Sequence, residues 1–149
     1  MKVSQYIRCF LQQRLAQVLL FMAATMLSLP SLAIEIIANP GVAVQNLPIN
    51  SARSMFGMRQ LSWSDGQQVR VFVLPDRHPL HIDFCKEVLN MYPYQLRQSW
   101  DRLIYSGMGQ APIEVNSEEE MLMLVARTPG AIGYLRKANT NAVHSISIR

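Results

Sequence analysis

Short apolar runs alternate along the chain with longer segments in which apolar residues recur at helical spacing. The short runs are rich in β-branched residues and are bounded by Gly, Pro, Asn or Asp, which is typical of buried strands. They predict strands at residues 34–38 ("IEIIA"), 69–74 ("VRVFVL"), 131–135 ("AIGYL") and 143–148 ("VHSISI").

The segments between these strands predict four helices. The first two cover residues 52–58 and 80–90, the third begins at Pro93 and the fourth begins after Ser117. Ser117 and Glu120 have the S-x-x-E spacing of a capping box, in which each residue binds a free N–H of the other. The order is β-α-β-α-α-α-β-β, which favours an α/β fold in a single small domain of the three-layer type.

Two local patterns give sharper predictions. In the third helix, Leu96, Trp100, Leu103 and Ile104 recur at i, i+4, i+7 and i+8, so we expect Trp100 to be buried under the sheet. The tetrapeptide "WSDG" at 63–66 predicts a tight turn, because Gly after Asp supplies the positive φ that such a reversal needs.

The first 33 residues are typical of a secretory signal peptide. A positively charged front precedes an apolar run at 15–29, and the small residues Ser31 and Ala33 stand where a signal peptidase reads. The run is shorter than the ~20 residues that span a bilayer. We therefore expect cleavage after Ala33, export to the periplasm and no membrane span in the mature part, residues 34–149; a retained membrane anchor is the alternative.

Charge and cysteine content narrow the functional classes. The leader holds three of the 14 basic residues and none of the ten acidic ones, so the mature part has a net charge of about +1. Nucleic-acid binding would need a clustered basic face. Cys85 is the single cysteine after the leader, and we expect a buried small hydrophobe. No Gly-x-Ser-x-Gly elbow or Walker glycine loop is present, so we expect neither an enzyme nor a cofactor.

The candidate chemistry lies in residues 74–84, "LPDRHPLHIDF". As an anion site, Arg77 would supply a bidentate charge and His78 a donor. The loop near Asn39 would form the other wall, because ligands of open α/β sheets bind at strand carboxyl ends. As a metal site, His78 and His81 would be the ligands, although the proline between them disfavours a shared helix face. The simpler alternative is that Asp76 and His78 only cap a helix.

Longer phrases resemble a known family. The chain carries, in order, "SMFGMRQLSWSDGQQVRVFVLP", "DFCKEVL", "YQLRQSWDRLIYSGMGQAP" and "SEEEMLMLVARTPGAIGYL". This series resembles the phosphate-type periplasmic substrate-binding proteins of ABC transporters, and more closely their short, single-domain relatives, over nearly all of residues 34–136. The resemblance implies one lobe of a type 2 periplasmic-binding fold. It also implies a non-enzymatic module that binds phosphate or another small anion for an ABC transporter or a membrane sensor.

The resemblance places residues 74–84 where the family has its anion-binding turn. Arg77 corresponds to the family arginine, whereas the family's glycines and hydroxyl residues are absent and Pro79 has no N–H to donate. We therefore expect weaker anion binding than in a two-lobed relative. A ligand-free interaction module in the periplasm is the alternative, with candidate contact residues Trp63, Tyr92, Tyr94 and Trp100.

Overall fold

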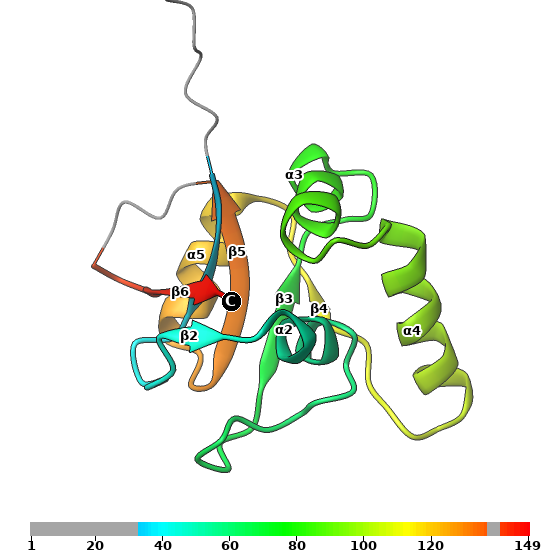
Figure 1. Cartoon of the computed structure of the whole chain (residues 1–149), viewed down its shortest axis with the longest axis horizontal. Coiled ribbons are helices and arrows are strands. Elements are labelled where there is room, and N and C mark those ends of the chain that lie inside the picture. Colours follow the sequence, from blue (N-terminus) through cyan, green and yellow to red (C-terminus); the bar gives the residue numbers. More distant parts are fainter. Residues whose placement is uncertain (1–32, 137–140) are drawn as a thin grey trace, which may run out of the picture. The chain divides into compact units, whose positions relative to one another are not determined.

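The computed structural model describes residues 33–136 and 141–149, which build a six-stranded sheet (Figure 1). The predicted leader lies outside these residues except for Ala33, so its cleavage stays a prediction. The strand order across the sheet is β2-β6-β1-β5-β3-β4. The strands are β1 (Ile34–Ala38), β2 (Asn46–Leu47), β3 (Arg70–Val73), β4 (Ile113–Glu114), β5 (Ala131–Arg136) and β6 (His144–Ile148).

The directions of the strands decide which loops meet. β3 is parallel to β5, β4 is parallel to β3, and β2 is parallel to β6. β1 is antiparallel to both of its neighbours, β5 and β6. The carboxyl ends of β3, β4 and β5 therefore share one edge of the sheet, and β1 ends at the opposite edge.

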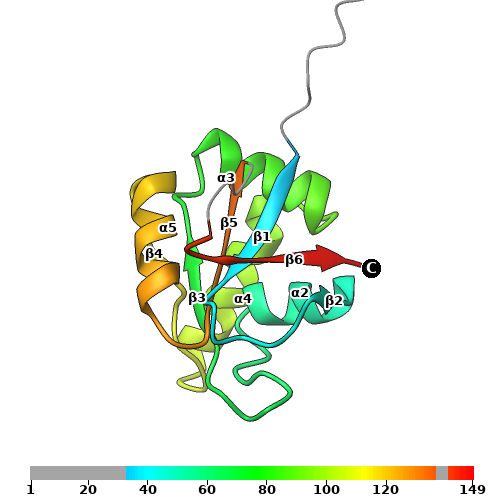
Figure 2. The ribbon, with the colours of Figure 1, turned by 90° about the vertical axis from the view of Figure 1, so that its left-hand side faces the viewer.

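Helices cover both faces of this sheet. In Figure 1, α5 lies on one side and α2, α3 and α4 lie on the other, and Figure 2 shows β1 and β6 toward the viewer, with α5 on the left and α2 on the right. Within the described residues, no helix is both long and apolar enough to cross a bilayer. The helices are α2 (Ile49–Phe56), α3 (Pro79–Asp83), the π-helical turn η1 (Phe84–Val88), α4 (Pro93–Tyr105) and α5 (Glu118–Arg127).

Strand β5 shows why the layers pack closely. A Cβ on Gly133 would lie 2.9 Å from the Met121 sulfur and 3.1 Å from Val125, so a larger residue would push these side chains of α5 aside. The next residue, Tyr134, points to the opposite face, because side chains alternate along a strand. Its ring stacks on Phe84 at 3.9 Å between centroids. Both faces of β5 are therefore buried.

The predicted α/β class and its three-layer type are confirmed. Two strands were missed, β2 and β4, because two residues carry no periodicity. The predicted helix at 80–90 is instead α3 continued by η1, where Leu89 N donates to Phe84 O at 3.1 Å. Trp100 is buried, 1% exposed, and its indole N–H donates to Phe56 O at 2.7 Å, so α4 is tied to α2.

The turn and cap predictions hold with one correction. Gly66 has φ +87° in the predicted turn, and the Asp65 carboxylate accepts from Gln67 N at 2.9 Å. Ser117 caps α5 by accepting from Glu120 N at 3.1 Å. The reciprocal half of the box is absent, because the Glu120 carboxylate instead accepts from Asn116 N at 2.8 Å.

Candidate functional site

The predicted site lies at the edge where three parallel strands end. Residues 75–78 follow β3 and lead into α3, Asn116 and Ser117 follow β4, and Arg136 is the last residue of β5. In open α/β sheets the loops at this edge are the usual place for ligands. The stretch at 74–84 therefore occupies the edge that sequence reasoning expected.

Three arginines stand at or near this edge, and they differ in their partners. Arg97 makes a two-pronged contact with Asp76, from Nε to Oδ2 and from Nη2 to Oδ1, both at 2.8 Å. Arg136 Nη2 donates to Asp83 Oδ2 at 2.7 Å. Arg77 is exposed and forms no hydrogen bond or ion pair with any described residue. Of these three guanidinium groups, only that of Arg77 is available to an external anion.

His78 is used as a helix cap. It precedes Pro79, the first residue of α3, and its Nδ1 accepts from Leu80 N at 3.2 Å. The first free N–H of this helix is therefore already bonded within the protein, so the start of α3 offers one donor fewer to an anion than the sequence implied. The other ring nitrogen of His78 has no partner among the described residues.

Asn39 lies away from this edge, which corrects the expectation that its loop forms the second wall. Because β1 runs against β5, Ala38 pairs with Ile132 at the beginning of β5, far from the end of β3. The Asn39 amide donates to the carbonyls of Val125 (3.0 Å) and Ala126 (2.9 Å) near the end of α5. The structure thus brings Arg77 and His78 together and leaves Asn39 at the opposite edge.

His81 belongs to a buried polar chain. Its side chain is fully buried, and its Nδ1 lies 2.6 Å from the Tyr134 hydroxyl oxygen, which also accepts from Leu74 N at 2.8 Å. Its Nε2 lies 3.5 Å from the Cys85 sulfur and 3.9 Å from the Asp76 carboxylate. These contacts join β5, the end of β3 and α3, so they hold the loop that carries Arg77.

Burial sets the protonation states of the side chains in this buried polar group. It lowers the pKa of His81 to about 4, against a smaller opposing effect of the Asp76 carboxylate, so the imidazole is neutral at pH 7. Burial also raises the pKa of the Cys85 thiol to about 12. A protonated, buried thiol is a poor nucleophile, so the predicted role of Cys85 as a small core residue fits its surroundings better than a catalytic one.

The two histidines do not form a metal site together. His81 points into the core, where both ring nitrogens face protein groups, and His78 points its Nδ1 at the start of α3. In the part of the chain that the structure describes, no three His, Cys, Asp or Glu side chains are grouped as metal ligands.

Sequence reasoning missed two residues that shape this edge, Tyr134 and Arg97. A tyrosine inside an otherwise apolar buried strand must find a partner for its hydroxyl, so the "AIGYL" run contained a signal for the polar chain. The ion pair of Arg97 with Asp76 joins residues 21 positions apart, and no local pattern announces it.

Several solved structures have a fold similar to that of the described domain. An ABC-type phosphate transport receptor from Vibrio cholerae matches with a TM-score of 0.59 and 16% identity, over 78% of this chain and 47% of that one. A putative phosphate ABC transporter substrate-binding protein with bound phosphate, from Clostridium perfringens, gives 0.59 and 13%, over 77% and 44%. PstS from Borrelia burgdorferi gives 0.58 and 12%, over 78% and 47%.

The described domain has part of a periplasmic-binding fold. The chain spans less than half the length of each of these solved structures, in accord with the single lobe that the sequence predicted. No protein-family model and no curated protein matches the sequence. At 12–16% identity the likeness shows the fold, and the ligand has to be argued from the site.

Proposed function

We propose that this chain is a solute-binding module of the periplasm that binds a small oxyanion, phosphate in the first instance, at the carboxyl edge of β3. Arg77 supplies the charge, and His78 adds a donor through the ring nitrogen that does not cap α3. An ABC transporter or a membrane sensor is the partner that such a module would serve, after export by the leader at 1–33.

One observation carries the proposal: Arg77 is exposed and uncompensated at the edge where solute-binding sheets place their ligands. A guanidinium group presents a fork of donors that matches phosphate and carboxylate oxygens. The neighbouring ion pair of Arg97 with Asp76 leaves Arg77 as the local positive charge that is still free. Solved structures of similar fold include one with bound phosphate, which adds support from the fold.

The affinity should be modest. Each hydrogen bond to a charged group contributes ~1.5–3 kcal/mol, and this edge has few free backbone donors because His78 binds Leu80 N. A site with two fewer donors than a glycine-rich turn binds roughly 10²–10⁴ times more weakly. We therefore expect dissociation constants around the millimolar range for inorganic phosphate.

The test is isothermal titration calorimetry of the purified protein with phosphate and sulfate at low ionic strength. Arg77→Ala should abolish the heat of binding, and Arg77→Lys should retain part of it as a point charge. Arg102→Ala is the matched control, because Arg102 is an exposed arginine on α4, outside this edge. Absence of binding at about 10 mM anion, or equal binding by Arg77→Ala, would refute the proposal.

A protein-binding role is the second candidate, and the exposed tyrosines favour it. Tyr92 is 57% exposed and Tyr94 is 60% exposed, and their rings stack at 5.7 Å between centroids. Exposed aromatic side chains are enriched in protein interfaces. Native mass spectrometry of the protein from the periplasm should then show a mass above one chain, and the double substitution of Tyr92 and Tyr94 by Ser should return it to one chain.

A further inference from the structure

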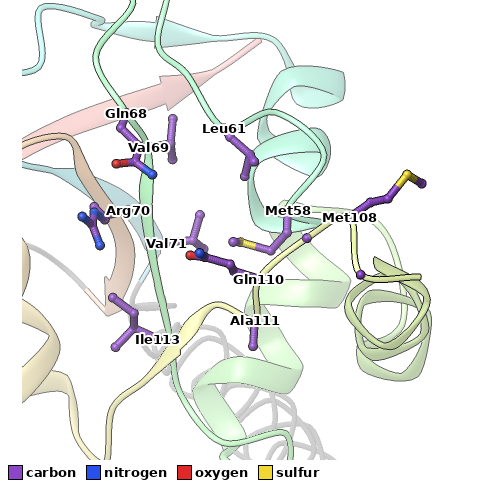
Figure 3. Close-up of a pocket in the computed structure, with 12 residues that line it drawn as sticks. Met58, Leu61, Gln68, Val69, Arg70, Val71, Met108, Gln110, Ala111 and Ile113 are labelled. Carbon is purple, nitrogen blue, oxygen red and sulfur yellow. The ribbon is translucent and has the colours of Figure 1, made fainter. Parts of the chain in front are cut away.

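A cavity of about 440 Å³ opens beside the first half of β3, at the opposite end of this strand from Arg77 (Figure 3). Cavities of ~300–1,000 Å³ are the usual size for small-molecule sites. The cavity is lined by Met58, Leu61, Gln68, Val69, Arg70, Val71, Gly107, Met108, Gly109, Gln110, Ala111 and Ile113.

The cavity exists because the side of β3 that faces away from β5 is paired in two places, and a gap lies between them. On the N-terminal side of the gap, Val69 N donates to Leu61 O at 2.8 Å. On its C-terminal side, β4 pairs with β3 only from Phe72 onward, and Val115 N donates to Val73 O at 2.9 Å. Val71 lies between these two pairings, one residue before the β3–β4 register begins.

One backbone donor therefore faces the cavity. Arg70 N donates to Gly130 O at 3.1 Å, on the β5 side of β3. Successive residues of a strand point their N–H groups to opposite edges, so the Val71 N–H points away from β5 and into the gap. It finds no acceptor among the described residues, although Val71 is only 2% exposed. Buried N–H groups without a partner are rare in proteins.

The lining of the cavity is part polar and part apolar: Gln68, Gln110 and Arg70 contribute polar side chains, and Arg70 carries a positive charge. Figure 3 shows the side chains of Met58 and Gln110 pointing toward Val71, with Arg70 across the strand from them. Arg70 is the sole charged residue of the lining, and it forms no ion pair with the described residues. Three of the exposed large hydrophobic side chains, Leu61, Met108 and Ile113, belong to this lining as well.

Met58 follows the end of α2 and contributes its side chain to this wall. Met58 has φ +60° just after the end of α2, a conformation that glycine adopts at lower cost. This conformation closes the helix, because Met58 N donates to Met55 O at 2.9 Å and Arg59 N donates to Ser54 O at 2.8 Å. The Met58 side chain is 8% exposed and forms part of the cavity wall.

We infer that this cavity binds a small organic carboxylate with an apolar body. One carboxylate oxygen accepts from the Val71 N–H, the other accepts from the Arg70 guanidinium, and the apolar body lies among Met58, Leu61 and Ile113. Inorganic phosphate suits the site less well, because Met58, Leu61 and Ile113 give it an apolar part that offers phosphate no donor. An added peptide strand suits it poorly too, because strand addition needs several backbone donors in a row and the gap exposes one.

Octanoate is the probe, titrated into the ¹⁵N-labelled protein and followed by its amide resonances. Saturable binding should move the Val71 amide resonance, and octanol, with the same chain and no charge, should bind at least tenfold more weakly. Arg70→Gln should weaken octanoate about tenfold to a hundredfold, since a charged hydrogen bond is lost. Ala111→Phe should block binding by filling the cavity, while Arg102→Gln, on α4, should leave it unchanged.

Several outcomes would overturn the inference. The site is a water-filled gap if octanoate fails to bind at about 10 mM, or if Arg70→Gln and Ala111→Phe bind it as the wild type does. The same holds if the resonances that move belong to another surface. Phosphate should neither compete with octanoate nor move Val71, so this test stands or falls separately from the anion site at Arg77.

Discussion

The buried imidazole of His81 should make the protein less stable in mild acid. Its Nδ1 lies against the Tyr134 hydroxyl and its Nε2 faces the thiol of Cys85, and the side chain has no exposure to water. Burial is the main cause of its low pKa; Arg97 and His78 lower it further, and Asp76 raises it. The folded protein therefore resists protonation of a ring that the unfolded chain protonates readily.

The sign and size follow from proton linkage. The pKa of His81 is 6.5 in the unfolded reference and about 4 in the folded state. Above pH 7 the ring is neutral in both states, and between pH 6.5 and 4 the unfolded state binds the proton more strongly, so stability falls as the pH falls. A pKa difference of about 2.5 corresponds to ~3 kcal/mol in full, of which ~2 kcal/mol is lost by pH 5.

Urea denaturation at pH 7.5, 6 and 5 measures this loss, in a range where most carboxylates stay ionised. His81→Gln should flatten the dependence, because it removes the buried ring that only the unfolded chain protonates readily. The His81 ring resonances should also stay constant from pH 7.5 to 5 in the folded protein. Equal slopes for wild type and His81→Gln, or a ring that titrates near pH 6.5, would refute the reasoning.

Four further predictions address the core, the thiol and the leader. Trp100→Ala should destabilise by ~3–5 kcal/mol in urea denaturation, because it deletes a fully buried aromatic ring, and a near-neutral effect would contradict its packing. Tyr134→Phe should cost ~1–3 kcal/mol in the same assay, since Leu74 N loses its acceptor. Cys85 should resist thiol reagents at pH 8 until the protein is unfolded; rapid labelling of the native state would count against its burial. N-terminal sequencing of the exported protein should begin at Ile34, and an uncleaved chain in the membrane would favour the anchor alternative.

Periodicity predicted the fold because the buried faces are continuous. The run "VRVFVL" is buried apart from Arg70, and in the α4 stripe Leu96 and Trp100 are buried, whereas Leu103 is partly buried and Ile104 is 42% exposed. The same logic fails for β2 and β4, each two residues long, which owe their pairing to neighbours already in place. The direction of the strands was a more consequential feature that the sequence did not predict. Nothing local to residues 34–38 indicates that β1 runs against β5, and this reversal separates Asn39 from Arg77.

Side-chain partners within the candidate stretch were also beyond sequence reasoning, and they change its meaning. Asp76 is paired with Arg97, His78 caps α3 and His81 is bonded to Tyr134. Each of these side chains has a structural use that accounts for its presence without a ligand. A polar residue whose bonds are satisfied inside the protein gives little evidence of binding, however suggestive its neighbours in the sequence are.

The same comparison of side-chain partners makes Arg77 the strongest candidate for binding in this stretch. The fold gains little from this side chain, because it is exposed and contacts no carboxylate in the described part of the chain. Substitutions at such positions change stability by no more than ~0.5 kcal/mol, so packing gives no reason for an arginine there. The loop beneath it, by contrast, is held by the buried chain from Tyr134 to His81 and by the Arg97 pair with Asp76. A free charge on a rigidly supported loop is the arrangement that a binding site requires, since the loop's ordering cost is met when the protein folds and not when the anion arrives.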